Sequence, residues 1–132
     1  MIPPFNESGY LPPGIHSATL EEIAGRFGKR SELRQVQMES IHWLVALAAR
    51  AGIRRIILNG SFATDIIEPN DVDCVLLLAD DPVDPAAEDE LQKGLPFLDI
   101  ALLGQADFDE LVNVTFATDR HGTPKGLLEV IS

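Results

Sequence analysis

Apolar residues recur at helical spacing in the first half of the chain. In the segment SELRQVQMESIHWLVALAARAG they return every three or four residues, a period that predicts a long amphipathic helix. Ser31 is placed to cap this helix, and Gly52 is placed to end it. A shorter helix is predicted before it, capped by Ser17 or Thr19 and ending at Gly28.

Further along, short continuous apolar runs replace the helical period. They predict strands near residues 54–60, 71–79, 97–103 and 126–131. The last of these is short and is expected at a sheet edge. A further helix is expected in ADFDELVNVTFATD, capped by Asp107. Helices that alternate with strands indicate an α/β or α+β fold, a small mixed sheet of about four strands packed with helices.

The N-terminal segment differs from the rest because it is rich in proline and glycine. Residues 1–16 are therefore expected to form an extended arm rather than a helix. The arm carries apolar side chains at Ile2, Phe5, Tyr10 and Leu11, so we expect it to lie on the domain. The length of 132 residues suits a single domain spanning 1–132.

Composition restricts the classes of partner. A formal net charge of −11 argues against direct binding to a nucleic-acid backbone. It does not argue against a small anionic substrate, because a bound divalent cation reverses the local field. The single cysteine, Cys74, precludes an internal disulfide and is expected as a reduced core thiol. No apolar run is long enough for a membrane span, and the N-terminus lacks the pattern of a signal peptide, so a cytoplasmic protein is expected.

Three aspartates interrupt the predicted strands. Asp71 and Asp73 open the strand DVDCVLLL, where residues two apart share one face roughly 7 Å apart. Asp99 lies in the middle of LPFLDIALLG. Each aspartate alone is explained as well by a turn or an exposed edge position. Together they would repel one another at one end of the sheet unless a cation lies between them, and magnesium prefers such oxygen ligands.

A Gly-Ser pair at the end of the preceding strand supplies a second signal. Gly60 lets a phosphate approach the backbone, and Ser61 offers a hydroxyl and an amide to phosphate oxygens. An ordinary turn explains the pair equally well. Arg120 and Lys125 flank a Gly-Thr-Pro turn, and their cationic side chains are candidates for binding phosphate. The alternative is that both side chains are simply exposed to solvent at the surface.

In this order and spacing, the residues resemble the nucleotidyltransferase-fold superfamily. The core GSFATDIIEPNDVD is similar to that of minimal nucleotidyltransferases, small single domains often encoded as toxin–antitoxin partners. The arm PPF…LPPGIH and the tail DRHGTPKG extend the resemblance to a family of small, mostly bacterial proteins. Such a fold places a short helix between the Gly-Ser pair and the paired aspartates, here about two turns long because Pro69 ends it.

The resemblance implies an activity and roles for these residues. It implies transfer of a nucleoside monophosphate from a nucleoside triphosphate such as ATP to an acceptor that the sequence does not identify. Gly60 and Ser61 would bind the triphosphate, and Arg120 and Lys125 are added as candidate phosphate contacts. Asp71, Asp73 and Asp99 would be catalytic and would hold Mg²⁺ or Mn²⁺, with Asp99 also serving as a base.

Two other classes of protein remain open. One is a non-catalytic binding protein with the same fold, such as the neutralising partner in a toxin–antitoxin pair encoded nearby. The other is a structural subunit whose acidic cluster binds nothing. In every case Trp43, Phe62 and Phe97 are expected in the core, and Cys74 is expected to face away from Asp73.

Overall fold

The computed structural model describes residues 2–81 and 83–131. Its centre is one mixed sheet with the strand order β1-β5-β2-β3-β4. The strands are β1 (Gly14–Thr19), β2 (Arg55–Asn59), β3 (Asp73–Leu77), β4 (Asp99–Leu103) and β5 (Gly126–Ile131). β1 runs parallel to β5 and β3 runs parallel to β4, whereas β2 is antiparallel to both of its neighbours. The predicted α/β class with a mixed sheet is confirmed.

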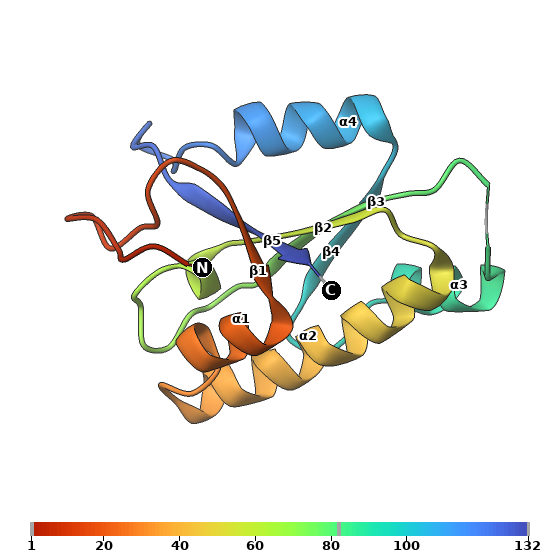
Figure 1. Cartoon of the computed structure of the whole chain (residues 1–132), viewed down its shortest axis with the longest axis horizontal. Helices are drawn as coiled ribbons and strands as arrows, with labels where there is room; N and C mark the ends of the chain where they lie inside the picture. Colours follow the sequence, from red (N-terminus) through yellow and green to blue (C-terminus); the bar gives the residue numbers. More distant parts are fainter. Residues whose placement is uncertain (1, 82, 132) are drawn as a thin grey trace.

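Helices cover both faces of this sheet (Figure 1). On one face lie α1 (Leu20–Phe27), α2 (Glu32–Ala51) and α3 (Pro85–Lys93), and on the other lies α4 (Gln105–Glu110), which continues as a π-helical segment, Leu111–Thr115. The predicted caps of the first two helices are confirmed. Thr19 forms a capping box at α1, Ser31 caps α2, and Gly52 ends α2 in the left-handed conformation that favours glycine.

Two hydrophobic clusters form the core because strand side chains alternate between the two faces. Leu58 of β2 and Cys74 of β3 enter the larger cluster under α1 and α2. Ile57 and Val75, each one residue away, enter the smaller cluster against Phe108 of α4. Cys74 is buried on the face opposite Asp73, as predicted, and burial raises the pKa of its thiol.

The sheet has five strands, so the expected number was one too few and the expected place of β5 was wrong. The extra strand is β1, which starts at Gly14 inside the predicted arm and pairs with β5 over six residues. β5 therefore lies between β1 and β2 rather than at an edge. The local sequence pattern did not predict this strand, because β1 is short and is stabilised by a partner strand more than a hundred residues away in the chain.

The rest of the arm lies against the domain, in agreement with its apolar composition. Leu11 is fully buried, and the Phe5 ring meets the Phe27 ring edge to face with 5.9 Å between centroids. Arg26 stacks over Phe5 and also donates a hydrogen bond to the carbonyl of Ile2. The arm thus contributes part of the hydrophobic surface that covers α1.

Three further expectations were wrong in detail. Phe62 is buried, but Trp43 and Phe97 are about half exposed, and Phe97 has a positive φ of 68°. The N-cap of α4 is Gly104 rather than Asp107, so the helix starts three residues earlier than a cap at Asp107 would place it. No helix within residues 2–81 and 83–131 is long and apolar enough to cross a membrane.

Candidate functional site

Two of the predicted carboxylates lie side by side at one end of the sheet. Asp73 opens β3 and is the register partner of Asp99, which opens β4, so their side chains project from the same sheet face. Asn59, the last residue of β2, is the register partner of Asp73 on its other side. Asp99 had been expected in the middle of its strand. It lies at the start instead, because the chain turns at residues 96–97 just before it.

Asp71 precedes β3 and binds the Gly-Ser turn that ends β2. Its Oδ1 accepts hydrogen bonds from the Ser61 amide at 3.0 Å and from the Ser61 hydroxyl at 2.5 Å. A Cβ added at Gly60 would stand only 2.8 Å from Asp71 Oδ2, and Gly60 also has a φ of 84°. Glycine is therefore required twice here, by backbone conformation and by space. In this structure, the group that approaches the Gly60 backbone closely is the Asp71 carboxylate.

This contact changes the interpretation of Ser61. Its amide and hydroxyl were assigned to phosphate, but in the structure both donate to Asp71. The helix expected after Ser61 is also shorter than two turns, because it is a single 3₁₀ turn, Ser61–Ala63. A phosphate at Ser61 would have to share or displace the Asp71 carboxylate.

The pKa values of the neighbouring Asp71 and Asp73 carboxyl groups are shifted in opposite directions. Burial tends to raise the pKa of Asp71, but the hydrogen bonds from Ser61 outweigh it and hold that pKa below its usual value. Burial and the negative charge of Asp71 raise the pKa of Asp73 to about 6. Asp99 adds to this effect, and Lys125 opposes it. Near neutral pH the pair thus carries closely spaced negative charge that a cation would relieve.

A cavity of about 430 Å³ joins this acidic pair to the C-terminal turn. Its walls include Gly60, Ser61, Asp71, Asp73, Arg120 and Lys125, together with Tyr10, Thr64, Ile66, Thr118, Asp119 and His121. The structure therefore brings together two carboxylates, a Gly-Ser turn and two cationic side chains that are separated by up to 65 positions in the sequence. These are the six predicted site residues other than Asp99.

Tyr10 and Asp119 hold the cationic side of the cavity in place. The Tyr10 hydroxyl donates to Asp119 Oδ2 at 2.7 Å, and Asp119 Oδ1 accepts from the amides of His121 and Thr123. The hydrogen bond to Asp119 is the main cause that raises the pKa of Tyr10. The N-terminal arm thereby fixes the turn between Arg120 and Lys125.

Asp99 lines a second, smaller cavity of about 220 Å³ on the other side of Asp73. Phe116 forms part of the same wall at the end of the π-helical segment, a type of distortion that is frequent at functional sites. Asp73 is therefore shared by both cavities, whereas Asp71 belongs to the first and Asp99 to the second.

The donor set limits how a metal could bind. Within the part of the chain that the structure describes, no group of three or more His, Cys, Asp or Glu residues is arranged to hold a metal ion. Asp71, Asp73 and Asp99 thus do not form one three-carboxylate site in this structure. Magnesium, however, is commonly held by one or two carboxylates and completes its shell with substrate phosphates. The adjacent carboxylates of Asp71 and Asp73 fit that mode.

Arg34 of α2 positions the loop that links Ser61 to Asp71. It is fully buried and donates hydrogen bonds to the backbone carbonyls of Phe62, Thr64 and Ile66 in the loop and of Phe27 in α1. Burial lowers the pKa of its guanidinium to about 10. A second α2 side chain, Gln37, donates to the carbonyl of Pro69. The loop is thus attached to the helix through its own carbonyl groups.

Sequence reasoning missed Tyr10, Asp119, Arg34 and Phe116. Asp119 stood in the quoted tail, but its role depends on a contact with Tyr10 across 109 positions. Arg34 carried a weak signal, since a charged residue one position after the apolar Leu33 lies close to the inner face of an amphipathic helix.

Comparison with known proteins adds one finding. A model of a family of unknown function, DUF6932, matches residues 3–131. The chain belongs to DUF6932. No curated protein and no solved structure matches it. In this DUF6932 member, the match includes the arm that carries Tyr10 and the turn that carries Arg120 and Lys125.

Proposed function

We propose that the chain is a metal-dependent nucleotidyltransferase that binds a nucleoside triphosphate in the cavity between Asp71, Asp73 and Lys125. The observation that supports it is the meeting, in one cavity, of a paired carboxylate and a Gly-Ser turn with Arg120 and Lys125 from the opposite end of the chain. Carboxylates attract the cation, and the basic side chains attract phosphate oxygens.

Each residue has a distinct task in this proposal. Asp71 and Asp73 hold Mg²⁺ or Mn²⁺, which when bound offsets phosphate charge and polarises the α-phosphorus. Lys125, which already interacts electrostatically with both carboxylates, binds the phosphates, and Arg120 assists it. Asp99, beside Asp73, takes the proton from the acceptor hydroxyl. The bond between the acceptor oxygen and the α-phosphorus forms, the bond to the leaving oxygen breaks, and pyrophosphate departs.

The rival proposal is a binding protein of the same fold without catalysis. Two observations favour it. Ser61 already donates both of its hydrogen bonds to Asp71, and the three carboxylates do not form one metal-binding group among the described residues. Such a protein would use the acidic surface to contact a partner, which in a toxin–antitoxin arrangement would be encoded nearby.

A labelling experiment tests the proposed activity. The protein is incubated with Mg²⁺ and each of four α-labelled nucleoside triphosphates, alone and with cell protein or RNA as a source of acceptor. We expect label transfer with release of pyrophosphate for the wild type and none for Asp73→Asn. Asp80→Asn, an exposed carboxylate away from the site, is the matched control and should retain activity. Label transfer that is equal in Asp73→Asn would contradict the assigned site.

A further inference from the structure

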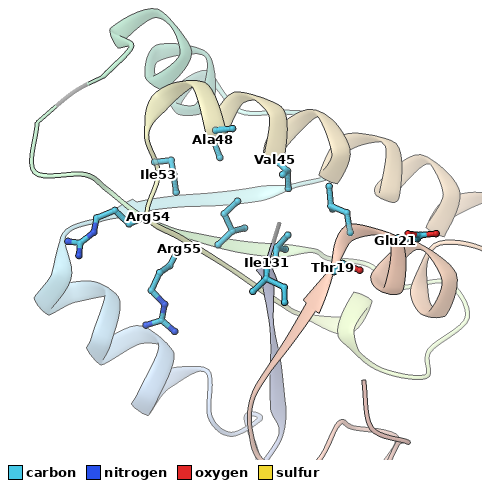
Figure 2. Close-up of a pocket in the computed structure, with 12 residues that line it drawn as sticks. Thr19, Glu21, Val45, Ala48, Ile53, Arg54, Arg55 and Ile131 are labelled. Atoms are coloured by element: carbon cyan, nitrogen blue, oxygen red, sulfur yellow. The ribbon is translucent and has the colours of Figure 1, made fainter. Parts of the chain in front are cut away.

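β4 is an edge strand whose outer side is open. It ends the strand order β1-β5-β2-β3-β4, and β3 is its only strand neighbour among the described residues. None of the five residues Asp99–Leu103 is buried, whereas four of the five residues of β3 are. The aliphatic groove beside α2, with Val45 and Ala48 in its wall (Figure 2), has no such edge, because β2 and β5 are interior strands. An open edge is a template for pairing with another strand.

The main-chain groups on the open side of β4 belong to Ile100 and Leu102. In a strand, the N–H and C=O groups of one residue point to the same side, and those of the next residue point to the opposite side. The Asp99 amide donates to the carbonyl of Val72, so Asp99 and every second residue after it face β3. Ile100 and Leu102 therefore each direct one N–H and one C=O outward. Within residues 2–81 and 83–131, no hydrogen bond outside the β3–β4 ladder reaches these groups.

The sequence of β4 has none of the features that usually keep a sheet edge unpaired. Such edges commonly carry lysine, proline or a bulge. β4 reads DIALL, keeps an unbroken register with β3 and has a single charged side chain, Asp99, at its first position. The opposite edge strand, β1, carries polar side chains at His16, Ser17 and Thr19. The aliphatic edge of the sheet is therefore β4.

A second copy of the chain fits this edge because the pattern of outward groups is self-complementary. When two β4 strands run antiparallel with Ala101 of each on a two-fold axis, Ile100 of one copy faces Leu102 of the other. These two residues exchange both of their hydrogen bonds, so every outward N–H and C=O of the strand finds a partner. Their side chains also form aliphatic cross-strand pairs. We propose that the chain forms a two-fold dimer in which the β4 edges pair and the two sheets become one.

The charges suit this register. Asp99 lies beside Leu103 of the second copy, and the length of β4 keeps the two Asp99 side chains about 13 Å apart at the rise of a strand. This distance exceeds the Debye length of about 8 Å at physiological salt. The net charge of −11 on each copy opposes association, so the dimer should tighten as salt is added. Because Asp99 and Ala101 line the second cavity, Leu103 of the second copy adds to its wall.

Charges at Ala101 test the register, because this residue faces itself across the two-fold axis. Ala101→Glu and Ala101→Lys each place like charges on Cα atoms about 4.5 Å apart, and each should weaken the dimer at least about tenfold. An equimolar mixture pairs glutamate with lysine and should restore a dimer within about threefold of the wild-type Kd. Ser17→Glu and Ser17→Lys, at an exposed position on the other sheet edge, are the matched controls and should dimerise like the wild type.

A proline on the open side tests the main-chain pairing and keeps the test decisive if a charge at Ala101 prevents folding. The N–H of Leu102 points outward, so Leu102→Pro removes a donor to the second copy but no bond to β3. Leu102→Ala loses the same side chain and keeps the donor, so the proline variant should dimerise at least about tenfold more weakly than the alanine variant. Sedimentation velocity between about 1 and 500 µM measures each Kd, and circular dichroism shows which variants fold.

A wild type that sediments as a monomer at every concentration, with and without added salt, would overturn the proposal. An Ala101 mixture that is no tighter than either variant alone would do the same. If the Ser17 variants weaken the dimer as much as the Ala101 variants, the pairing edge is β1 instead. Equal dimerisation of Leu102→Pro and Leu102→Ala would assign association to side chains rather than to paired strands. None of these outcomes depends on nucleotide binding, because every measurement uses the protein alone.

Discussion

The Ser61 hydroxyl lies 2.5 Å from Oδ1 of Asp71, and the Ser61 amide donates to the same oxygen at 3.0 Å. The serine at the end of β2 and the aspartate before β3 therefore form one unit, with Gly60 providing the space. This unit fixes where the first carboxylate stands relative to Asp73.

Removal of the Ser61 hydroxyl tests this relationship. In Ser61→Ala we expect the pKa of Asp71 to rise, because a hydrogen bond to the charged carboxylate is lost. The free energy of unfolding should fall by about 1 kcal/mol. NMR titration of the Asp71 carboxyl carbon measures the first effect and urea unfolding the second. Ser17→Ala, at an exposed position on β1, is the control. An unchanged Asp71 titration in Ser61→Ala would show that the contact is not formed in solution.

The pH dependence of stability should report the raised pKa of Asp73. The pKa of Asp73 is about 6 in the folded protein, above its value in the unfolded chain. At pH values between these two pKa values, the native state therefore binds one more proton at this site than the unfolded state does. The resulting stabilisation is complete below about pH 4 and is lost as pH rises through 6. Because Asp73 is only half-buried, we expect the wild type to lose roughly 1 kcal/mol from pH 4 to 7 that Asp73→Asn does not lose.

Urea unfolding of both proteins at several pH values checks this expectation. The comparison reports Asp73 together with its effect on Asp71, because the two carboxyl groups interact and the remaining titrating groups are common to the two proteins. Asp80→Asn, at an exposed position, should follow the wild-type curve. Parallel curves for wild type and Asp73→Asn would mean that the folded state does not raise the pKa of Asp73.

Arg34 should be among the most costly residues to replace. Arg34→Met removes the donors that satisfy loop carbonyls of Phe62, Thr64 and Ile66, which lie in or beside the core. We expect a loss of at least about 3 kcal/mol in the free energy of unfolding. Arg30→Met removes one exposed hydrogen bond to the same loop and should cost less than about 1 kcal/mol. Similar losses in the two variants would contradict the role given to Arg34.

The N-terminal arm should act on the C-terminal turn through Tyr10. Tyr10→Phe keeps the ring but removes the hydroxyl that donates to Asp119. We expect a loss of about 1 kcal/mol and faster hydrogen exchange at the amides of His121 and Thr123, which Asp119 also binds. If exchange at these amides is unchanged, the arm does not stabilise the turn.

Much of the fold could be predicted from local pattern. The helical period and the caps at Ser31 and Gly52 located α2 within a residue, because these signals act over a few neighbouring positions. β1 could not be located in this way. Its sequence GIHSAT has no clear alternation, and it becomes a strand because it pairs with β5 at the other end of the chain. The error over β1 also caused the error over the position of β5.

The candidate site was predictable in its residues but not in its contacts. The two-residue spacing placed Asp71 and Asp73 close together, and their cavity does contain Gly60, Lys125 and Arg120. The expectation that both aspartates lie on the strand was wrong, because β3 begins only at Asp73 and Asp71 belongs to the preceding loop, where it binds Ser61. No pattern could show that Ser61 donates to Asp71, since this contact depends on the angle of a tight turn. The exposed positions of Trp43 and Phe97 were likewise unpredictable from residue type alone.

Thermal unfolding with Mg²⁺ and a nucleoside triphosphate tests the central claim most directly, because a ligand that binds only the folded state raises the melting temperature. We expect a small shift with either ligand alone and a rise of about 5 °C with both at saturating concentration, since the phosphates complete the shell of the metal. Asp73→Asn should lose this rise while keeping its own stability, and Asp80→Asn should retain it. A wild type that shows no shift with Mg²⁺ or Mn²⁺ together with any of the four triphosphates would contradict the nucleotidyltransferase proposal.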